Sequence, residues 1–200
     1  MSKFVSFNSV SFAYPAQTVL LLERVTFAFH GGWYGVIGAN GAGKTTLLML
    51  ACGLLRPLDG SIEGNQWSLY LPQRTDLPPE NFQDLLDSFD SRAYRLMLTM
   101  GVQLDWLERW STLSHGERKR AQLAAALFRD PHILAVDEPT NHLDVDARKI
   151  IIDALLKYRG VGLIVVTIGN CWMPCAVIVC GLILPKSYYV QGIIPVCAKQ

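Results

Sequence analysis

The sequence has little net charge and lacks the usual features of secreted or membrane proteins. Its 18 Lys and Arg residues balance 17 Asp and Glu residues, which neither indicates nor excludes a nucleic-acid partner. The first residues show a strand-like alternation instead of a basic segment and an apolar segment, so we expect no signal peptide. The longest apolar stretch, 176–184, is well short of the roughly 20 residues of a membrane helix. We therefore expect a cytoplasmic protein without direct membrane insertion.

The five cysteines do not form a metal-binding pattern. Four of them crowd residues 171–197 without a C-x-x-C pair and without a histidine after them, whereas a zinc site needs such ligand spacing. The fifth, Cys52, is interpreted as a reduced, buried thiol.

A glycine-rich segment between a predicted strand and a predicted helix is the strongest functional signal. The segment GANGAGKTT, residues 38–46, follows an apolar run at 33–37 and precedes a helical pattern at 47–52. Glycines allow a tight loop whose N–H groups face phosphates, and the helix N-terminus adds partial positive charge. In such a loop Lys44 reaches the β- and γ-phosphates and the Thr45 hydroxyl ligates Mg²⁺. The segment predicts a nucleoside triphosphate ligand; the alternative is a turn that contains Lys and Thr by coincidence.

The apolar patterns predict an α/β fold, and 200 residues suffice for one such domain with a sizeable core. Residues 3–29 indicate antiparallel strands, and the continuous apolar runs at 133–136 and 161–166 are typical of buried parallel strands. Between them, apolar residues at three- and four-residue steps predict a small helical insert within 80–110. We expect its core to contain Phe82, Leu85, Leu86, Phe89, Tyr94, Leu96, Met97, Met100, Leu104, Trp106, Leu107 and Trp110.

Polar residues stand where predicted strands end. Gln73 follows a short strand at 68–71 and is able to offer its carbonyl oxygen to Mg²⁺ or water, although alone it would be a surface residue. Asp137 and Glu138 follow the run at 133–136, at the carboxyl edge where open α/β sheets bind ligands. We expect Asp137 to hold Mg²⁺ through water and Glu138 to polarise the attacking water.

A second helix N-terminus is a further candidate for anion binding. Ser114 is predicted to be its N-cap, with Glu117 completing a capping box, and the helix is expected to end near Phe128. Helix formation alone explains this pattern, yet Ser114, Gly116 and the helix N-terminus would also suit a γ-phosphate. The basic side chains at 118–120 are expected to be solvated.

Taken in order over residues 3–166, these motifs resemble the ATP-binding cassette (ABC) ATPase family. The resemblance implies an ABC-type P-loop nucleotide-binding domain with an antiparallel β subdomain, a parallel-sheet core and a small helical subdomain at about 80–130. Tyr14, on a turn, stands at the place of the family's aromatic A-loop, where it would stack on a base, although a turn tyrosine is more often a rim residue. The signature reads LSHGE at 113–117, with His115 in place of the usual glycine, a change that we expect to be tolerated.

The resemblance also assigns roles to individual residues. Glu138 and Gln73 are the implied catalytic residues, and Thr45, Gln73 and Asp137 the implied Mg²⁺ ligands. The implied nucleotide-binding residues are Tyr14, Gly38, Asn40, Gly41, Ala42, Gly43, Lys44, Thr45, Thr46, Ser114, Gly116 and Asp144.

By the same resemblance the ligands are ATP and Mg²⁺, and the first partner is a second cassette in a homodimer or a tandem protein. Two cassettes would pair head to tail, with each ATP between one phosphate loop and the other signature. The run DEPTNHLD at 137–144, the signature ending in Glu117 and the short 73–113 segment resemble the ABC-F group, soluble ATPases that act on ribosomes. The ribosome is therefore favoured as a further partner over a transporter's membrane subunit. A non-hydrolysing nucleotide-binding module is the other alternative.

The resemblance ends after Val166. There the family places a switch histidine, whereas this chain reads TIGNCWMP at 167–174 and has no histidine after His142. One choice of codons for 167–173 lets a neighbouring frame read HDRELLD, the motif expected of the family. We infer an ABC domain at 1–166 and an out-of-frame tail at 167–200, with a genuinely divergent C-terminus as the alternative. In both cases we expect ATP binding with weak or absent turnover.

Overall fold

The computed structural model describes residues 3–15, 17, 19–141 and 143–166, and the backbone of residues 176–183 and 187–195. The chain forms two compact units, each treated separately below. Unit 1 comprises Met1–Tyr70, His132–Glu138 and Arg159–Gln200, and unit 2 comprises Leu71–Pro131 and Pro139–Tyr158.

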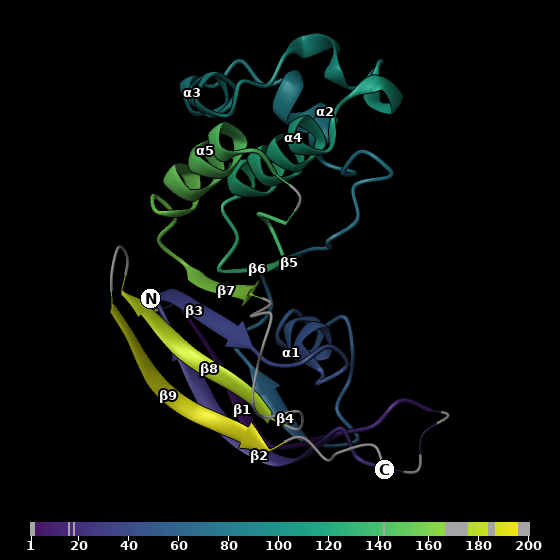
Figure 1. Ribbon diagram of the computed structural model, residues 1–200, viewed down its shortest axis with the longest axis vertical. Helices are drawn as coiled ribbons and strands as arrows, with labels where there is room; N and C mark the ends of the chain where they lie inside the picture. The colour runs from purple at the N-terminus through teal and green to yellow at the C-terminus, as the bar shows by residue number, and fades with distance from the viewer. Residues whose placement is uncertain are drawn as a thin grey trace. The chain divides into compact units, whose positions relative to one another are not determined.

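Unit 1 is built on two β-sheets (Figure 1). One is a three-stranded antiparallel sheet with the order β2-β1-β4, and the other has six strands in the order β5-β6-β7-β3-β8-β9. The bounds are β1 Phe4–Phe12, β2 Leu22–His30, β3 Gly32–Ile37, β4 Asp59–Glu63, β5 Ser68–Leu71, β6 Ile133–Asp137, β7 Val161–Val166, β8 Ala176–Ile183 and β9 Ser187–Pro195. The predicted antiparallel and parallel parts of an α/β fold are confirmed.

The register of the larger sheet brings three strand ends to one edge. Strands β3 and β6 both run parallel to β7, with Ile37 opposite Val166 and Asp137 opposite Val165. The carboxyl ends of β3, β6 and β7 therefore meet, and the phosphate loop leaves β3 at that edge. Strand β8 is antiparallel to β3 and forms a hairpin with β9, as Figure 1 shows.

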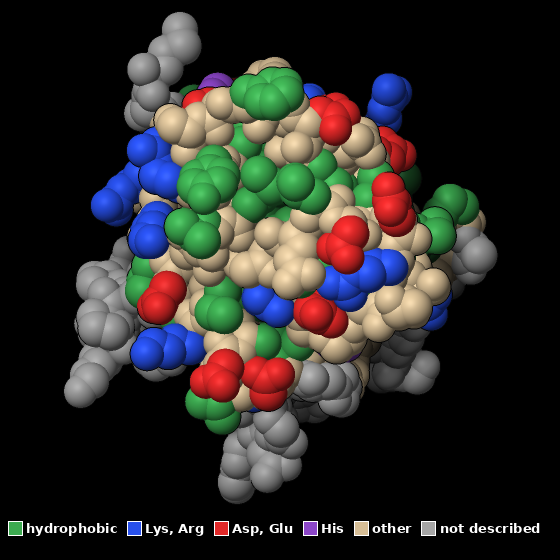
Figure 2. Space-filling model, turned by 90° about the horizontal axis from the view of Figure 1, so that it is seen from above, with side chains coloured by type: hydrophobic (Ala, Val, Ile, Leu, Met, Phe, Trp, Pro, Cys, Tyr) green, Lys and Arg blue, Asp and Glu red, His purple; other side chains and the backbone are tan. Residues whose placement is uncertain are grey.

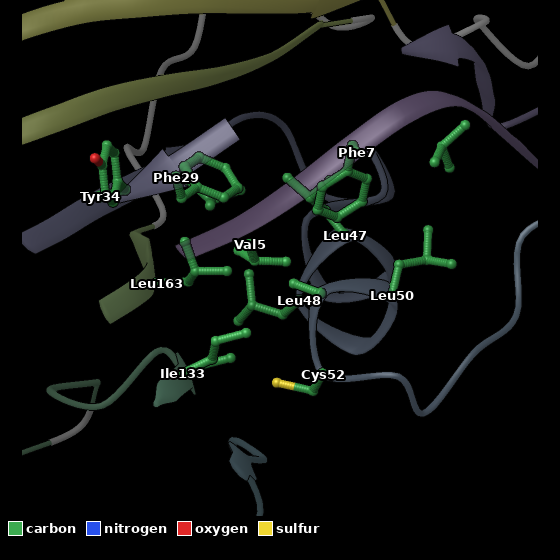
Figure 3. Packing of buried hydrophobic residues seen from close by; sticks show 14 of the residues in the cluster. Val5, Phe7, Phe29, Tyr34, Leu47, Leu48, Leu50, Cys52, Ile133 and Leu163 are labelled. Carbon is green, nitrogen blue, oxygen red and sulfur yellow. The ribbon is translucent and has the colours of Figure 1, made fainter. Parts of the chain in front are cut away.

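The core of unit 1 is formed by both sheets and by helix α1, Lys44–Ala51. Helix α1 contacts β6 and β7. In Figure 3, Val5 of β1, Leu48 of α1, Ile133 of β6 and Leu163 of β7 lie in one cluster, and all four are fully buried. Burying this face of α1 fixes the rotation of the helix, and with it the direction of the polar residues in its first turn.

Unit 2 is helical. It contains α2 Phe82–Leu86, α3 Ser91–Met100, α4 His115–Phe128, α5 Val145–Leu155 and the 3₁₀ helices Leu104–Trp106 and Trp110–Thr112. Helix α4 contacts α2, α3 and α5, and the predicted core residues Phe82, Leu85, Met100, Trp106 and Trp110 are buried. In the part of the chain that the structure describes, no helix has the length and apolar character needed to cross a bilayer.

Three of the predicted core residues of unit 2 are exposed instead. These are Phe89, Tyr94 and Leu104. A step of three or four residues shows which side chains share a helix face, but not whether another element covers that face. Hydrophobic side chains also lie among charged ones on the face that Figure 2 shows.

Leu48→Ala tests the role of the α1 face. We expect the free energy of unfolding to fall by about 2–5 kcal/mol, because Leu48 has no exposed surface and its loss leaves a cavity. Leu54→Ala is the matched control: this side chain, just after the helix, is 56% exposed, and a change within about 0.5 kcal/mol is expected. Urea unfolding measures both, and equal losses would contradict this account of the core.

Candidate functional site

The phosphate loop adopts a backbone that requires glycine at two positions. Gly41 and Gly43 have φ angles of +81° and +84°, a region that L side chains rarely adopt. Gly43 is the N-cap of α1, and the first turn of α1 contains no acidic residue. The partial positive charge of this helix end is therefore not offset by an acidic side chain in its own first turn.

Lys44 is held against the loop that precedes it. Its side chain is 7% exposed, and Nζ donates hydrogen bonds of 2.9 Å to the carbonyl oxygens of Gly38 and Ala39. These bonds keep an ammonium group beside the loop backbone. Such a cation suits a polyphosphate ligand, for which Lys acts as a point charge.

Asp137 connects three elements of unit 1. Its buried carboxylate accepts a 2.6 Å hydrogen bond from Thr45 Oγ1 of α1 and a 3.1 Å bond from the Tyr70 hydroxyl of β5, both at Oδ2. Burial and the neighbouring Asp137 charge raise the pKa of Tyr70, so its hydroxyl remains a donor at neutral pH. Threonine and carboxylate oxygens are ligands that Mg²⁺ prefers, and the residues brought together here fit that ion.

Tyr14 lies beside the start of α1. Its hydroxyl is 2.9 Å from Thr46 Oγ1, and its ring packs edge-on against Phe12 with centroids 5.1 Å apart. The side chain remains 37% exposed. Tyr14 thus presents an aromatic surface next to the phosphate loop, and Asn40 and Gly41 of the loop are also exposed.

Glu138 has an uncommon backbone conformation. It directly follows Asp137, is half-buried, and has a φ of +46°, which costs a non-glycine residue on the order of 1 kcal/mol. Such strain is frequent at functional sites, where the surrounding structure maintains it.

In unit 2, the N-terminus of α4 is closed by the predicted capping box. The Ser114 N–H donates to Glu117 Oε2 at 2.7 Å, and the Glu117 N–H donates to Ser114 Oγ at 3.3 Å. The bond from the Ser114 N–H to the carboxylate, and after it the Ser114 side chain, lower the pKa of Glu117. The prediction of this cap is confirmed, and so is the helix end at Phe128. His115 follows the cap and places Nδ1 3.3 Å from Thr75 Oγ1.

Gly116 and Asp144 lie close together in unit 2. A Cβ added at Gly116 would lie 3.4 Å from Ala147 Cβ, and Asp144 Oδ1 accepts a 2.7 Å hydrogen bond from the Ala147 N–H as the N-cap of α5. The signature and the segment at 143–144 therefore meet at the start of α5. Packing leaves room for a methyl group at Gly116, so the fold does not require glycine there.

The three basic residues expected to be solvated are instead held to unit 2. Arg118 and Arg120 are half-buried and donate to the carbonyl oxygens of Trp110 and Met100. Lys119 is 2% exposed. The expectation was wrong because nearby backbone carbonyls need donors when they are buried, and long basic side chains supply them.

Lys119 and Gln122 fasten the segment that carries Gln73. Lys119 Nζ donates to Pro72 O at 2.7 Å and to Gln122 Oε1 at 2.9 Å. Gln122 Nε2 donates to Arg74 O at 3.4 Å. The backbone on both sides of Gln73 is thus bonded to α4, while the Gln73 side chain is exposed. We call these bonds the α4 clamp.

The candidate residues fall into two groups, one in each unit. Unit 1 brings together the phosphate loop, Tyr14, Asp137 and Glu138, and unit 2 brings together Ser114, Gly116 and Asp144, with Gln73 on the segment held by the α4 clamp. The switch segment at 167–174 and His142 lie outside the described residues.

Sequence reasoning did not single out Tyr70, Lys119 or Gln122. The sequence did contain a signal for Tyr70. This polar aromatic residue stands near the end of the predicted strand at 68–71, whose neighbour β6 ends at Asp137. No pattern marked Lys119 and Gln122, since the backbone carbonyls that they bond, at Pro72 and Arg74, are distant in sequence.

Cys52 is a buried free cysteine, as predicted. Burial raises the pKa of its thiol to about 12, so it remains protonated and unreactive at neutral pH. The side chains of the other four cysteines lie outside what the structure describes.

Comparison with known proteins decides the family. A family model described as ABC transporter matches residues 22–141. The chain belongs to this family. Membership implies an ATP-binding domain of the ABC ATPase type.

Individual relatives refine this assignment. A putative ABC transporter ATP-binding protein of Archaeoglobus fulgidus is 29% identical over 79% of this chain and 77% of that protein. The ribosome protection protein VmlR of Bacillus subtilis is 32% identical over 79% of this chain, and ABC transporter F family member 3 of Arabidopsis thaliana is 29% identical over 78%. The chain spans only 30% and 23% of these two proteins. This ABC ATPase is most like the ABC-F group.

Lys119→Met tests the α4 clamp. Methionine keeps the length of the side chain but leaves Pro72 O and Gln122 Oε1 without this donor, so we expect the free energy of unfolding to fall by about 1–3 kcal/mol. Lys149→Met on the exposed surface of α5 is the control and should change it by less than about 0.5 kcal/mol. Urea unfolding distinguishes the two variants. An unchanged free energy of unfolding in Lys119→Met would show that the α4 clamp adds nothing to stability.

Proposed function

We propose that the chain binds ATP with Mg²⁺ and turns it over slowly in a head-to-tail pair of cassettes, as an ABC-F type ATPase that works with the ribosome. The main observation that supports binding of the Mg²⁺–nucleotide complex is the 2.6 Å hydrogen bond between Thr45 and Asp137. It joins the hydroxyl proposed as a Mg²⁺ ligand to the acidic end of β6. The ribosomal part rests on the run at 137–144 and on relatives such as the ribosome protection protein and the F family member.

The proposed reaction is attack of water on the γ-phosphorus. A P–O bond to water forms, the bond to the β-phosphate oxygen breaks, and ADP leaves. Glu138 would orient the water and accept its proton, while Lys44 and the N-terminus of α1 stabilise the negative charge of the phosphates. Mg²⁺ would supply further neutralisation of the phosphate oxygens. Thr45, Asp137 and Gln73 are the proposed groups that hold it.

Two further contacts complete the proposed binding of ATP. The exposed ring of Tyr14 would stack on the base, because every base offers a π face. Ser114, Gly116 and Asp144 would face the ATP of the partner cassette. This assignment explains why glycine occupies position 116 although packing leaves room for a methyl group.

Slow turnover is proposed because the sequence has no histidine after His142 to serve as the switch residue.

We propose the boundary of the ABC domain at residue 166 and attribute 167–200 to an altered reading frame. Sequencing the gene from codon 160 onward tests this: a neighbouring frame that continues with HDRELLD supports it. If every other frame is closed, the tail is native and the frame proposal is wrong.

A second candidate function is that of the ATP-binding subunit of a transporter. The observation favouring it is the match over 77% of a putative ABC transporter ATP-binding protein, compared with less than a third of the relatives named for ribosome protection or the F family. Sedimentation of the chain with ribosomes in the presence of ATP supports the first function. Recruitment to membranes only when a membrane partner is present supports the second.

Lys44→Ala tests nucleotide binding. We expect the variant to lose at least about tenfold in affinity for a fluorescent ATP analogue, because it removes the cation held beside the loop. Phosphate release by the wild-type chain should remain far below the roughly 1–10³ s⁻¹ of typical enzymes. Equal affinities would contradict ATP binding at this loop. Release at typical rates that Glu138→Gln abolishes would contradict slow turnover, and tight binding with no release at all favours a non-hydrolysing module.

Gly116→Ala tests cassette pairing. In a Glu138→Gln background, which slows hydrolysis, we expect ATP-dependent dimers of the parent chain and their loss when Gly116→Ala is added, as size-exclusion chromatography would measure. Affinity of the monomer for ATP should not change, and the free energy of unfolding should stay equal or rise by up to about 1 kcal/mol, since alanine favours helices. Undiminished dimers in the presence of Gly116→Ala would rule out a role for this glycine in pairing.

A further inference from the structure

The Asp137 carboxylate has two hydrogen-bond partners among the described residues, Thr45 and Tyr70, and neither the motifs nor the comparisons assign a role to Tyr70. It is the penultimate residue of its strand, β5, which neighbours β6 in the larger sheet. Its hydroxyl donates to Asp137 Oδ2 at 3.1 Å, and its half-buried ring packs against the core of unit 1. The ring is therefore anchored while its hydroxyl reaches the acidic end of β6.

The two hydrogen bonds to Asp137 come from different elements and end on the same oxygen. Thr45 donates from α1 and Tyr70 donates from β5, both to Oδ2. Two donors that converge from separate elements restrict rotation of the carboxylate more than one donor does. The other oxygen, Oδ1, takes no part in either bond.

We propose that Tyr70 is a positioning residue for Mg²⁺ of the bound nucleotide, acting by holding the Asp137 carboxylate in one orientation. This inference rests on the proposed function. Groups that hydrogen-bond to metal-binding carboxylates orient them, and their loss commonly lowers metal affinity 10–100-fold. Tyr70 is expected to affect Mg²⁺ and not the nucleotide directly, because among the described residues its hydroxyl bonds Asp137 and no atom of the phosphate loop.

Tyr70→Phe tests this proposal, because it keeps the ring and removes only the hydroxyl. Affinity for a fluorescent ATP analogue is measured in EDTA and over a series of Mg²⁺ concentrations. We expect the affinity in EDTA to stay within about twofold of wild type. The Mg²⁺ concentration that gives half of the metal-dependent change should rise about 10–100-fold.

Tyr34→Phe is the matched control in the same unit. Its hydroxyl accepts a 3.2 Å hydrogen bond from the His30 N–H, so this variant also removes one tyrosine hydroxyl from unit 1 but leaves Asp137 untouched. We expect its Mg²⁺ dependence to equal that of wild type. A shift in both variants would indicate a general loss of structure and would overturn the proposal.

A double-mutant cycle with Asp137→Asn tests whether Tyr70 acts through the carboxylate. In the Asp137→Asn background, adding Tyr70→Phe should change the Mg²⁺ dependence by less than about twofold, because the group that it orients is gone. An undiminished effect there overturns the proposal. So does a Tyr70→Phe variant with wild-type or tighter Mg²⁺ dependence, or one that loses affinity equally with and without Mg²⁺.

Failure of the proposed function gives a different result. A wild-type chain that binds no nucleotide under any of these conditions overturns the proposed function and this inference with it. A wild-type chain that binds the Mg²⁺–nucleotide complex, with Tyr70→Phe indistinguishable from it, overturns the role of Tyr70 alone.

Discussion

The hydrogen bond from Thr45 to Asp137 connects the two segments around which unit 1 is arranged. Thr45 belongs to the first turn of α1, and Asp137 is the last residue of β6. They meet because the parallel register of β3, β7 and β6 brings their carboxyl ends to one edge. The apolar face of α1 is buried in the core, which sets the rotation of the helix. Hydrophobic packing of the later residues of α1 thus orients the polar residues of its first turn.

In unit 2, the residues that cap two helices are also residues to which the ABC resemblance assigns a contact with the nucleotide. Ser114 caps α4, and Asp144 caps α5. An N-cap contributes about 1 kcal/mol to stability, so substitution of either residue lowers the stability of unit 2 and removes the proposed contact at the same time. Gly116 differs from both, because its surroundings accept a methyl group. It is therefore the residue of this group at which folding and function are most readily separated.

Sequence patterns predicted the fold well where apolar runs were continuous or helix caps explicit. The strands at 68–71 and 161–166 and the helix from Ser114 to Phe128 are examples. Prediction failed for Phe89, Tyr94 and Leu104, because periodicity does not reveal which face has a neighbour. It failed for Lys119 because no local motif marks the backbone carbonyl of Pro72 that the side chain bonds. The sequence motifs identified Asp137 and Thr45 as site residues but not Tyr70, which bonds Asp137 from a third segment, β5.

The burial of Lys119 has a chemical consequence. Acylation requires that an amine attack the reagent through a free lone pair. Lys119 is 2% exposed, and its ammonium group donates hydrogen bonds to Pro72 O and Gln122 Oε1. Such a lysine becomes modifiable only when α4 separates from the chain around Gln73, an opening whose frequency reflects local stability. The rate at which Lys119 acquires a label, relative to exposed Lys149, would therefore record how often this part of unit 2 opens in the otherwise folded protein.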